Sequence, residues 1–161
     1  MSALALDYRA ALGSQSASAY ENNLDRFSLV GKDDSSYSIT WERRRLLLSD
    51  LAMVFEECSE ENWDGQDAAP LSLKAYLEAR DFILALPIWV SDPEIVAEPG
   101  GGMGFQWMLG PNRIFTASLD GKNVLTYAGI LGVPERTRYG SEEFDGEIPK
   151  EILEGLAEIH Q

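Results

Sequence analysis

The residues best suited to chemistry in this sequence lie in one acidic turn, Glu60-Glu61-Asn62-Trp63-Asp64-Gly65. Glu60, Asn62 and Asp64 stand at alternate positions and a glycine follows, as at the start of a calcium-binding EF-hand loop. The twelfth position of such a loop carries a bidentate carboxylate, and this chain has Leu71 there. The pattern therefore favours a structural turn, and no metal is assigned to it.

In the structural interpretation, Asn62 or Asp64 closes the turn by accepting hydrogen bonds from backbone amides. Gly65 is expected to adopt a positive φ, which costs glycine little. Trp63 is expected to be buried, so that it anchors the turn in the core.

A second glycine-rich segment, Gly100-Gly101-Gly102 with Gly104, invites comparison with a phosphate-binding loop. Such a loop runs from a strand into a helix and, in the P-loop version, carries a lysine. Here a strand is expected to follow and no lysine is near. We expect a hairpin turn that exposes its glycines, or a lip over a groove, and no nucleotide or other cofactor.

Nucleophilic catalysis requires a base beside the nucleophile, and the one histidine is His160, next to the last residue. Cys58 falls on the apolar side of a predicted helix, which is typical of an inert buried thiol. No catalytic residue is assigned. A carboxylate-based hydrolase, with or without a divalent ion, stays open as the rival function, with Asp64, Asp67 and Glu98 as its candidates.

The charge of the chain limits its partners. There are 27 acidic residues against 13 basic ones, a net charge of -14. Direct nucleic-acid binding needs clustered lysine and arginine, so it is not expected, and neither is membrane association. The segment 56–67 holds acids and no base, and we interpret it as a docking surface for a basic protein. Its acidic residues are Glu56, Glu57, Glu60, Glu61, Asp64 and Asp67.

Three alternatives to this docking surface remain. The acids could be ordinary solvated surface that keeps the protein soluble. They could imitate nucleic acid and block a protein that binds DNA or RNA. A homo-oligomeric subunit would instead show a large exposed apolar patch. Tryptophans on separate predicted elements add a hint of a binding surface; they are Trp41, Trp63, Trp89 and Trp107.

Hydrophobic periodicity predicts an α+β fold, an antiparallel meander of three to five strands covered on one side by two or three helices. The predicted helices cover 40–58, with Thr40 as N-cap, and 71–86, and a last helix follows Pro149 and packs at an edge of the sheet. Residues 140–146 are rich in acids and are expected to form a loop. The predicted strands are 94–98, 103–109, 113–119 and 122–128.

Residues 1–38 differ in composition from the rest and are interpreted as an N-terminal arm, with an edge strand at 26–31. Residues 39–161 are expected to form a single domain. One cysteine and no recognisable signal sequence favour a cytoplasmic protein.

Two spaced motifs resemble a group of small bacterial and phage proteins. The first is Asn62-Trp63-Asp64-Gly65 followed by Ala68 and Pro70. The second is Gly101-Gly102 followed by Trp107 on the next strand. The similarity covers about residues 60–130. It implies the same α+β fold, with these residues in structural roles, and it implies no activity.

Overall fold

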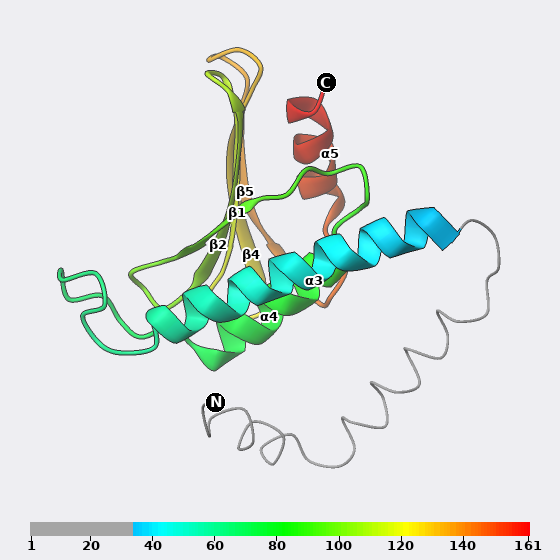
Figure 1. The fold of residues 1–161 in the computed structure, drawn as a ribbon. Helices are drawn as coiled ribbons and strands as arrows, with labels where there is room; N and C mark the ends of the chain where they lie inside the picture. The colour runs from blue at the N-terminus through cyan, green and yellow to red at the C-terminus, as the bar shows by residue number, and fades with distance from the viewer. Residues whose placement is uncertain (1–33) are drawn as a thin grey trace. The chain divides into compact units, whose positions relative to one another are not determined.

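A five-stranded antiparallel sheet forms the centre of the computed structural model, which describes the backbone of residues 34–161 and the side chains of residues 40–161. The strands follow chain order, so the sheet is a meander (Figure 1). They are β1 (Glu94–Ala97), β2 (Met103–Gly110), β3 (Arg113–Leu119), β4 (Val124–Leu131) and β5 (Thr137–Glu143). The predicted α+β class is confirmed.

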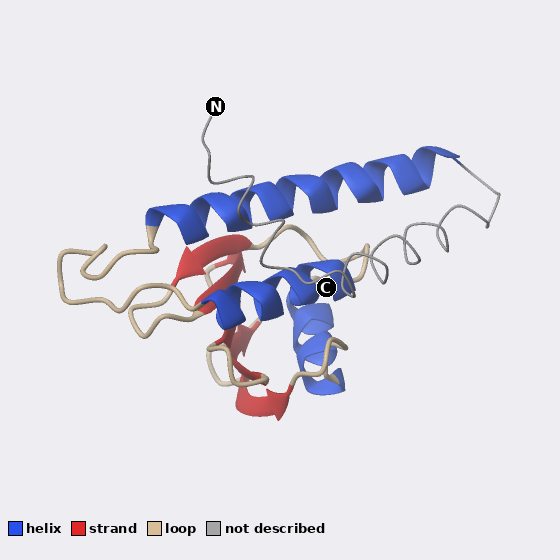
Figure 2. Cartoon of the chain, turned by 90° about the horizontal axis from the view of Figure 1, so that it is seen from below, coloured by secondary structure: helices blue, strands red, loops and turns tan. Residues whose placement is uncertain are grey.

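Three helices belong to the described chain: α3 (Asp34–Glu57), α4 (Leu73–Ala85) and α5 (Lys150–Ile159). α3 and α4 run side by side in opposite directions (Figures 1 and 2), and the rings of Phe55 and Tyr76 meet between them at 4.7 Å. None of these helices is long and apolar enough to span a bilayer. Residues 40–161 form one compact unit.

The start of α3 was predicted wrongly. Thr40 lies inside the helix and does not cap it, because neither proline nor glycine interrupts the chain between Asp34 and Glu57. Of the predicted arm, the structure describes only the residues that begin α3. The proposed edge strand at 26–31 lies outside the described residues.

The side chain of Ser72 caps α4 by accepting a hydrogen bond from the amide of Ala75, and Pro87 follows soon after the helix ends. Glu78, in the middle of α4, fastens the β3–β4 hairpin. Its carboxylate accepts the backbone N–H of Gly121 at 3.0 Å and that of Asn123 at 2.8 Å.

The prediction of a loop at residues 140–146 is wrong in its first half, because Gly140 to Glu143 belong to β5. This edge strand carries almost no apolar residues, so alternation of hydrophobicity could not reveal it. Arg138 on β5 is held instead by α5, through Glu154 at 3.0 Å and Glu158 at 3.1 Å.

α5 also lies elsewhere than expected. It packs on β3 and β4 rather than at an edge of the sheet. Gly155 makes this possible, because a Cβ at that position would lie 2.3 Å from the ring of Phe115. The core between helices and sheet includes Leu51, Phe82, Ile83, Phe105, Trp107, Phe115, Leu125, Ile152 and Leu156, all fully buried.

Candidate functional site

The connection between α3 and α4, residues 58–71, is here named the acidic loop. The carboxylate of Asp64 organises its centre, since one oxygen, Oδ1, accepts the N–H of Gln66 at 2.7 Å and that of Ala68 at 3.1 Å. Gly65 has the expected positive φ, 73°. One of the two oxygens of the Asp64 carboxylate is therefore used by the loop's own backbone.

Asn62 closes the same turn from the other side. Its Oδ1 accepts the N–H of Asp67 at 2.9 Å, and its own N–H donates to the carbonyl of Ala68 at 2.8 Å. Asn62 and Asp67 have φ of 62° and 65°, and such residues tolerate the left-handed region better than most. Short polar side chains thus specify the shape of the loop.

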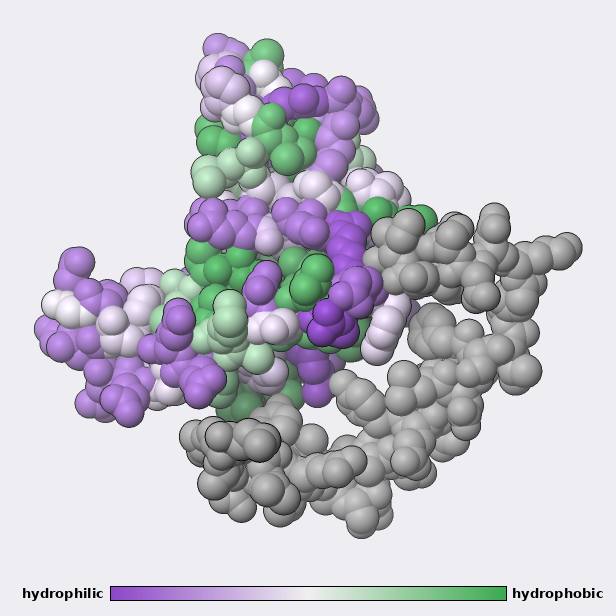
Figure 3. Space-filling view, viewed as in Figure 1, coloured by the Kyte–Doolittle hydropathy of each residue, from purple (hydrophilic) through white to green (hydrophobic). Residues whose placement is uncertain are grey.

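Trp63 is not buried in the core, so that prediction is wrong. The indole is half-buried, and its Nε1–H donates to the carbonyl of Ala69 at 2.9 Å. The loop projects from the body of the domain (Figure 3), and Trp63 is not among the partly buried residues that pack against the described core. Trp63 stabilises the loop by a local hydrogen bond.

The two motifs behind the suggested resemblance meet in space. The N–H of Ala69 donates to the carbonyl of Pro99 at 2.8 Å, and that of Ser72 donates to the carbonyl of Gly101 at 2.9 Å. Gly101 has φ of 86°, and a Cβ there would lie 2.9 Å from the carbonyl oxygen of Pro70. Close backbone packing explains why glycine occupies this position.

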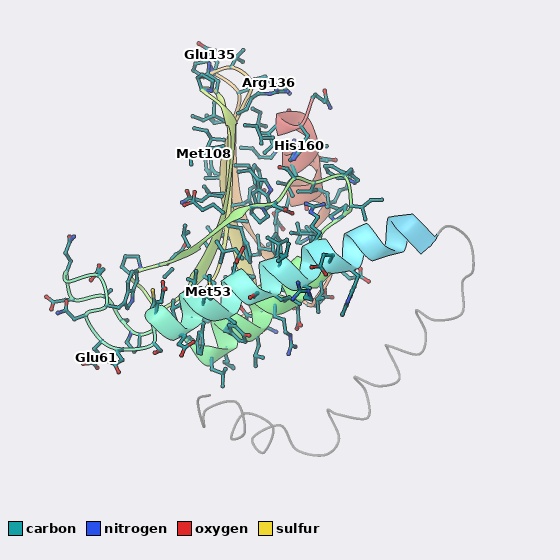
Figure 4. All side chains as sticks on the ribbon, in the orientation of Figure 1. Met53, Glu61, Met108, Glu135, Arg136 and His160 are labelled. Carbon is teal, nitrogen blue, oxygen red and sulfur yellow. The ribbon has the colours of Figure 1, made fainter. Side chains whose placement is uncertain are left out.

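The six predicted docking residues lie in this hydrogen-bonded loop, except Glu56 and Glu57, which belong to the end of α3. Five of them are exposed, and Asp64 is half-buried. Within the described part of the chain, none of the six forms a salt bridge. Figure 4 shows Glu61 at the outer end of the loop, and Figure 3 shows the loop as mostly hydrophilic. The five exposed residues are Glu56, Glu57, Glu60, Glu61 and Asp67.

The candidates for a carboxylate-based hydrolase lie on two separate segments of the chain. Among the described residues, no three or more His, Cys, Asp or Glu side chains are placed to hold a metal ion. Asp64 and Asp67 belong to the acidic loop. Glu98 lies close against Gly102 and Gly104 at the start of β2.

The glycine segment forms the β1–β2 hairpin turn. The N–H of Gly101 donates to the carbonyl of Glu98, and the N–H of Glu98 donates to the carbonyl of Gly102, both at 2.9 Å. The prediction of a turn holds, but only Gly100 is exposed, whereas Gly101 and Gly102 are buried. The segment is a packed turn and not an open lip.

The tryptophans do not gather in one surface. Trp107 is buried, with 1% of its surface exposed, and its Nε1–H donates to the carbonyl of Ser91 at 2.8 Å. Trp41 on α3 and Trp89 before β1 are exposed by 56% and 49%. Only Trp63 belongs to the acidic loop.

Ser91 and His160 form a contact that sequence reasoning missed. His160 Nε2 lies 2.9 Å from Ser91 Oγ, and Nδ1 lies 2.7 Å from the carbonyl oxygen of Leu156. Because only a protonated Nδ1 can bond that carbonyl, Nε2 is the acceptor. It also accepts the backbone N–H of Ser91 at 2.9 Å, so the pair ties the end of α5 to the segment before β1. A separation of 69 residues gives no local signal for such a pair.

Cys58 is half-buried rather than fully buried. Burial, and to a lesser degree the charge of Glu57, raise the pKa of its thiol. A thiol that resists ionisation is a poor nucleophile, which agrees with the inert role expected for it.

Comparison with known proteins gives no family assignment: no family model matches this chain, and no curated protein or solved structure shows significant similarity to it.

Proposed function

We propose that this protein is a non-catalytic interaction module whose acidic loop docks a basic partner protein, in the manner of an accessory or inhibitory factor. The observation that carries the proposal is a rigid loop whose exposed carboxylates have no cationic partner in the described chain. A cytoplasmic location and a bacterial or phage origin belong to the same proposal.

The shape of the loop supports this function. The side chains of Asp64 and Asn62 accept backbone N–H groups of the loop and Trp63 donates to a backbone carbonyl, so the backbone is held before any partner arrives. A preorganised loop loses little conformational freedom on binding. Clustered charge of one sign also steers a basic partner and raises association rates by roughly 10 to 10³.

The magnitude of such contacts sets the expected affinity. An exposed ion pair contributes only about 0.2–1 kcal/mol, so several pairs together give modest and strongly salt-dependent binding. The Debye length falls from about 10 Å at 0.1 M salt to about 3 Å at 1 M. A partner held by the acidic loop should therefore dissociate as salt is added.

The test is affinity capture from a lysate of the source organism at low and high salt. The variant replaces the five exposed acids by isosteric amides (E56Q, E57Q, E60Q, E61Q, D67N) and keeps Asp64, which the fold of the loop requires. The expected result is one basic protein that the wild type retains at low salt and that the variant loses.

A matched control carries the same change in charge elsewhere: D50N, E94Q, E135Q, E147Q and E151Q, all at exposed positions. The control should retain the partner. Loss of the partner from both variants would show that net charge alone attracts it. Retention by the loop variant would exclude the acidic loop as the docking surface.

The same capture separates the nucleic-acid mimic from a general docking module. If the loop imitates a phosphate backbone, added DNA or RNA should displace the captured protein, because both ligands compete for one basic surface. If nucleic acid and this protein bind the partner together, the mimic is excluded and the docking module remains.

A further inference from the structure

The face of the sheet that points away from the helices is uncovered within the described chain. Figure 4 shows Met108 on this side and His160 on the other. Strand register places Met108, Ile114 and Ile130 in one row across β2, β3 and β4. The next row ends with Ala128 opposite Tyr139 on β5. We name this surface the open sheet face.

A hollow of about 370 Å³ lies on the open sheet face. Its lining includes Ala128, whose small side chain leaves the space, together with Ile114 and Ile130. Tyr139 forms one wall of the hollow, and 80% of its surface is exposed. A knob and a hollow thus lie next to each other on one face.

The charge of this face differs from that of the whole molecule. The chain has a net charge of -14, yet the residues of β2, β3 and β4 on this side are uncharged, and acids occur at its margins, as Glu94, Glu98 and Glu143. Arg138 reaches the rim of the hollow, but its guanidinium is bound to α5. A basic partner finds no charge to recognise here.

These features fit a second copy of the same chain. Two copies that both carry -14 repel each other least where neither presents charge. An interface with two-fold symmetry requires one patch that complements itself, and a knob beside a hollow satisfies that requirement. We propose that two copies pack through their open sheet faces, with Tyr139 of each copy in the hollow of the other.

The size of the face predicts a weak dimer. Four strands about 4.8 Å apart and about seven residues long at 3.3 Å each cover roughly 440 Å² per copy in projection. Stable complexes bury about 800 Å² per partner. The dimer should therefore form reversibly with a dissociation constant on the order of micromolar or weaker.

Salt distinguishes this dimer from docking at the acidic loop. Added salt screens the repulsion between two negative copies, so it should tighten the dimer, whereas it should weaken the binding of a basic partner. Either proposal can fail without the other.

The test is sedimentation velocity of the full chain over a wide concentration range, at low and high salt. Ala128→Glu places a carboxylate in the hollow, and because Ala128 is exposed the folded monomer tolerates it. Ala52→Glu, at an exposed position of α3, makes the same chemical change on another surface and serves as the control.

The expected result is a monomer–dimer equilibrium in the wild type and in Ala52→Glu, with a dissociation constant raised at least about tenfold in Ala128→Glu, because each interface then buries two unpaired charges. A monomer at every concentration overturns the proposal, as does a dimer that Ala128→Glu leaves unchanged. If the wild type is a monomer and Ala128→Glu, but not Ala52→Glu, lowers its melting temperature, a segment of the same chain covers the face. That result also overturns the proposal.

Discussion

At the scale of single residues, short polar side chains define the candidate site. Asp64 forms its hydrogen bonds within the loop, since its Oδ1 accepts two backbone N–H groups within 3.1 Å. Its neighbour Glu61 is exposed and makes no hydrogen bond or ion pair with the described residues. The two residues carry the same charge in one loop, yet one stabilises the fold and the other is available to a partner.

This difference can be measured by truncating each acid to alanine. Asp64→Ala leaves the amides of Gln66 and Ala68 without their acceptor, so we expect it to lower the free energy of unfolding by about 1–2 kcal/mol. Glu61→Ala should change that free energy by less than about 0.5 kcal/mol. Urea unfolding followed by far-ultraviolet circular dichroism would measure both. Equal losses would show that Asp64 has no special part in the loop.

At the scale of elements, ion pairs attach the last strand to the last helix. Arg138 on β5 bonds Glu154 and Glu158 on α5, and Lys150 lies 3.3 Å from Glu154. β5 has few apolar side chains, so these contacts supply part of the attachment that a core residue would provide elsewhere. They also connect the sheet edge to the helix that covers β3 and β4.

The stability that the ion pairs of Glu154 contribute should depend on pH in a predictable direction. The guanidinium of Arg138, followed by Lys150, holds the pKa of Glu154 below its ordinary value of 4.5. A carboxyl whose pKa is lower in the folded state stabilises the fold above its unfolded pKa, and this contribution is lost as the pH falls through the folded value.

Glu154→Gln should therefore lower the melting temperature at neutral pH by about 2 °C or less, since the group is exposed, and the difference from wild type should shrink as the pH falls below 4.5. Glu135→Gln, at the exposed β4–β5 tip, is the control and should match the wild type throughout. Thermal unfolding across pH 3 to 7 would measure this. A difference that does not shrink at all between pH 7 and pH 3 would contradict an electrostatic origin.

At the scale of the whole molecule, hydrophobic pattern and turn residues were sufficient to predict the sheet order and two of the three helices closely. They failed where polar contacts between distant residues decide the structure. β5 depends on Arg138 and its partners on α5, and the tie between Ser91 and His160 joins segments with no local signal. Trp63 was assigned to the core because of its residue type, although the loop that carries it projects from the domain.

In the candidate site, too, features set by local sequence could be predicted, and features set by distant parts of the chain could not. The turn chemistry of Asn62, Asp64 and Gly65 follows from local preferences that any chain shares, so it could be predicted. The open sheet face could not, because alternation identifies which residues share a face and does not tell whether another element covers it. Within the described residues that face is uncovered, because all three described helices contribute to the core on the other side of the sheet.

The net charge leads to a last prediction for the molecule as a whole. An excess of 14 acids over bases makes the folded chain repel itself, and the ion pairs that oppose this repulsion lie mostly at the surface, where each is weak. Screening should therefore remove more repulsion than attraction. We expect the melting temperature to rise by several degrees between about 0.02 M and 0.5 M sodium chloride.

The variant with five amides in place of the exposed acids of the loop provides the control, because it carries five fewer negative charges and should gain less from the same salt. Differential scanning calorimetry of both proteins at matched pH would measure how the melting temperature of each changes with salt concentration. A melting temperature that falls with salt would mean that ion pairs such as those of Arg138 outweigh the repulsion. The unpaired acids of the acidic loop would then add little to the net repulsion within the folded chain.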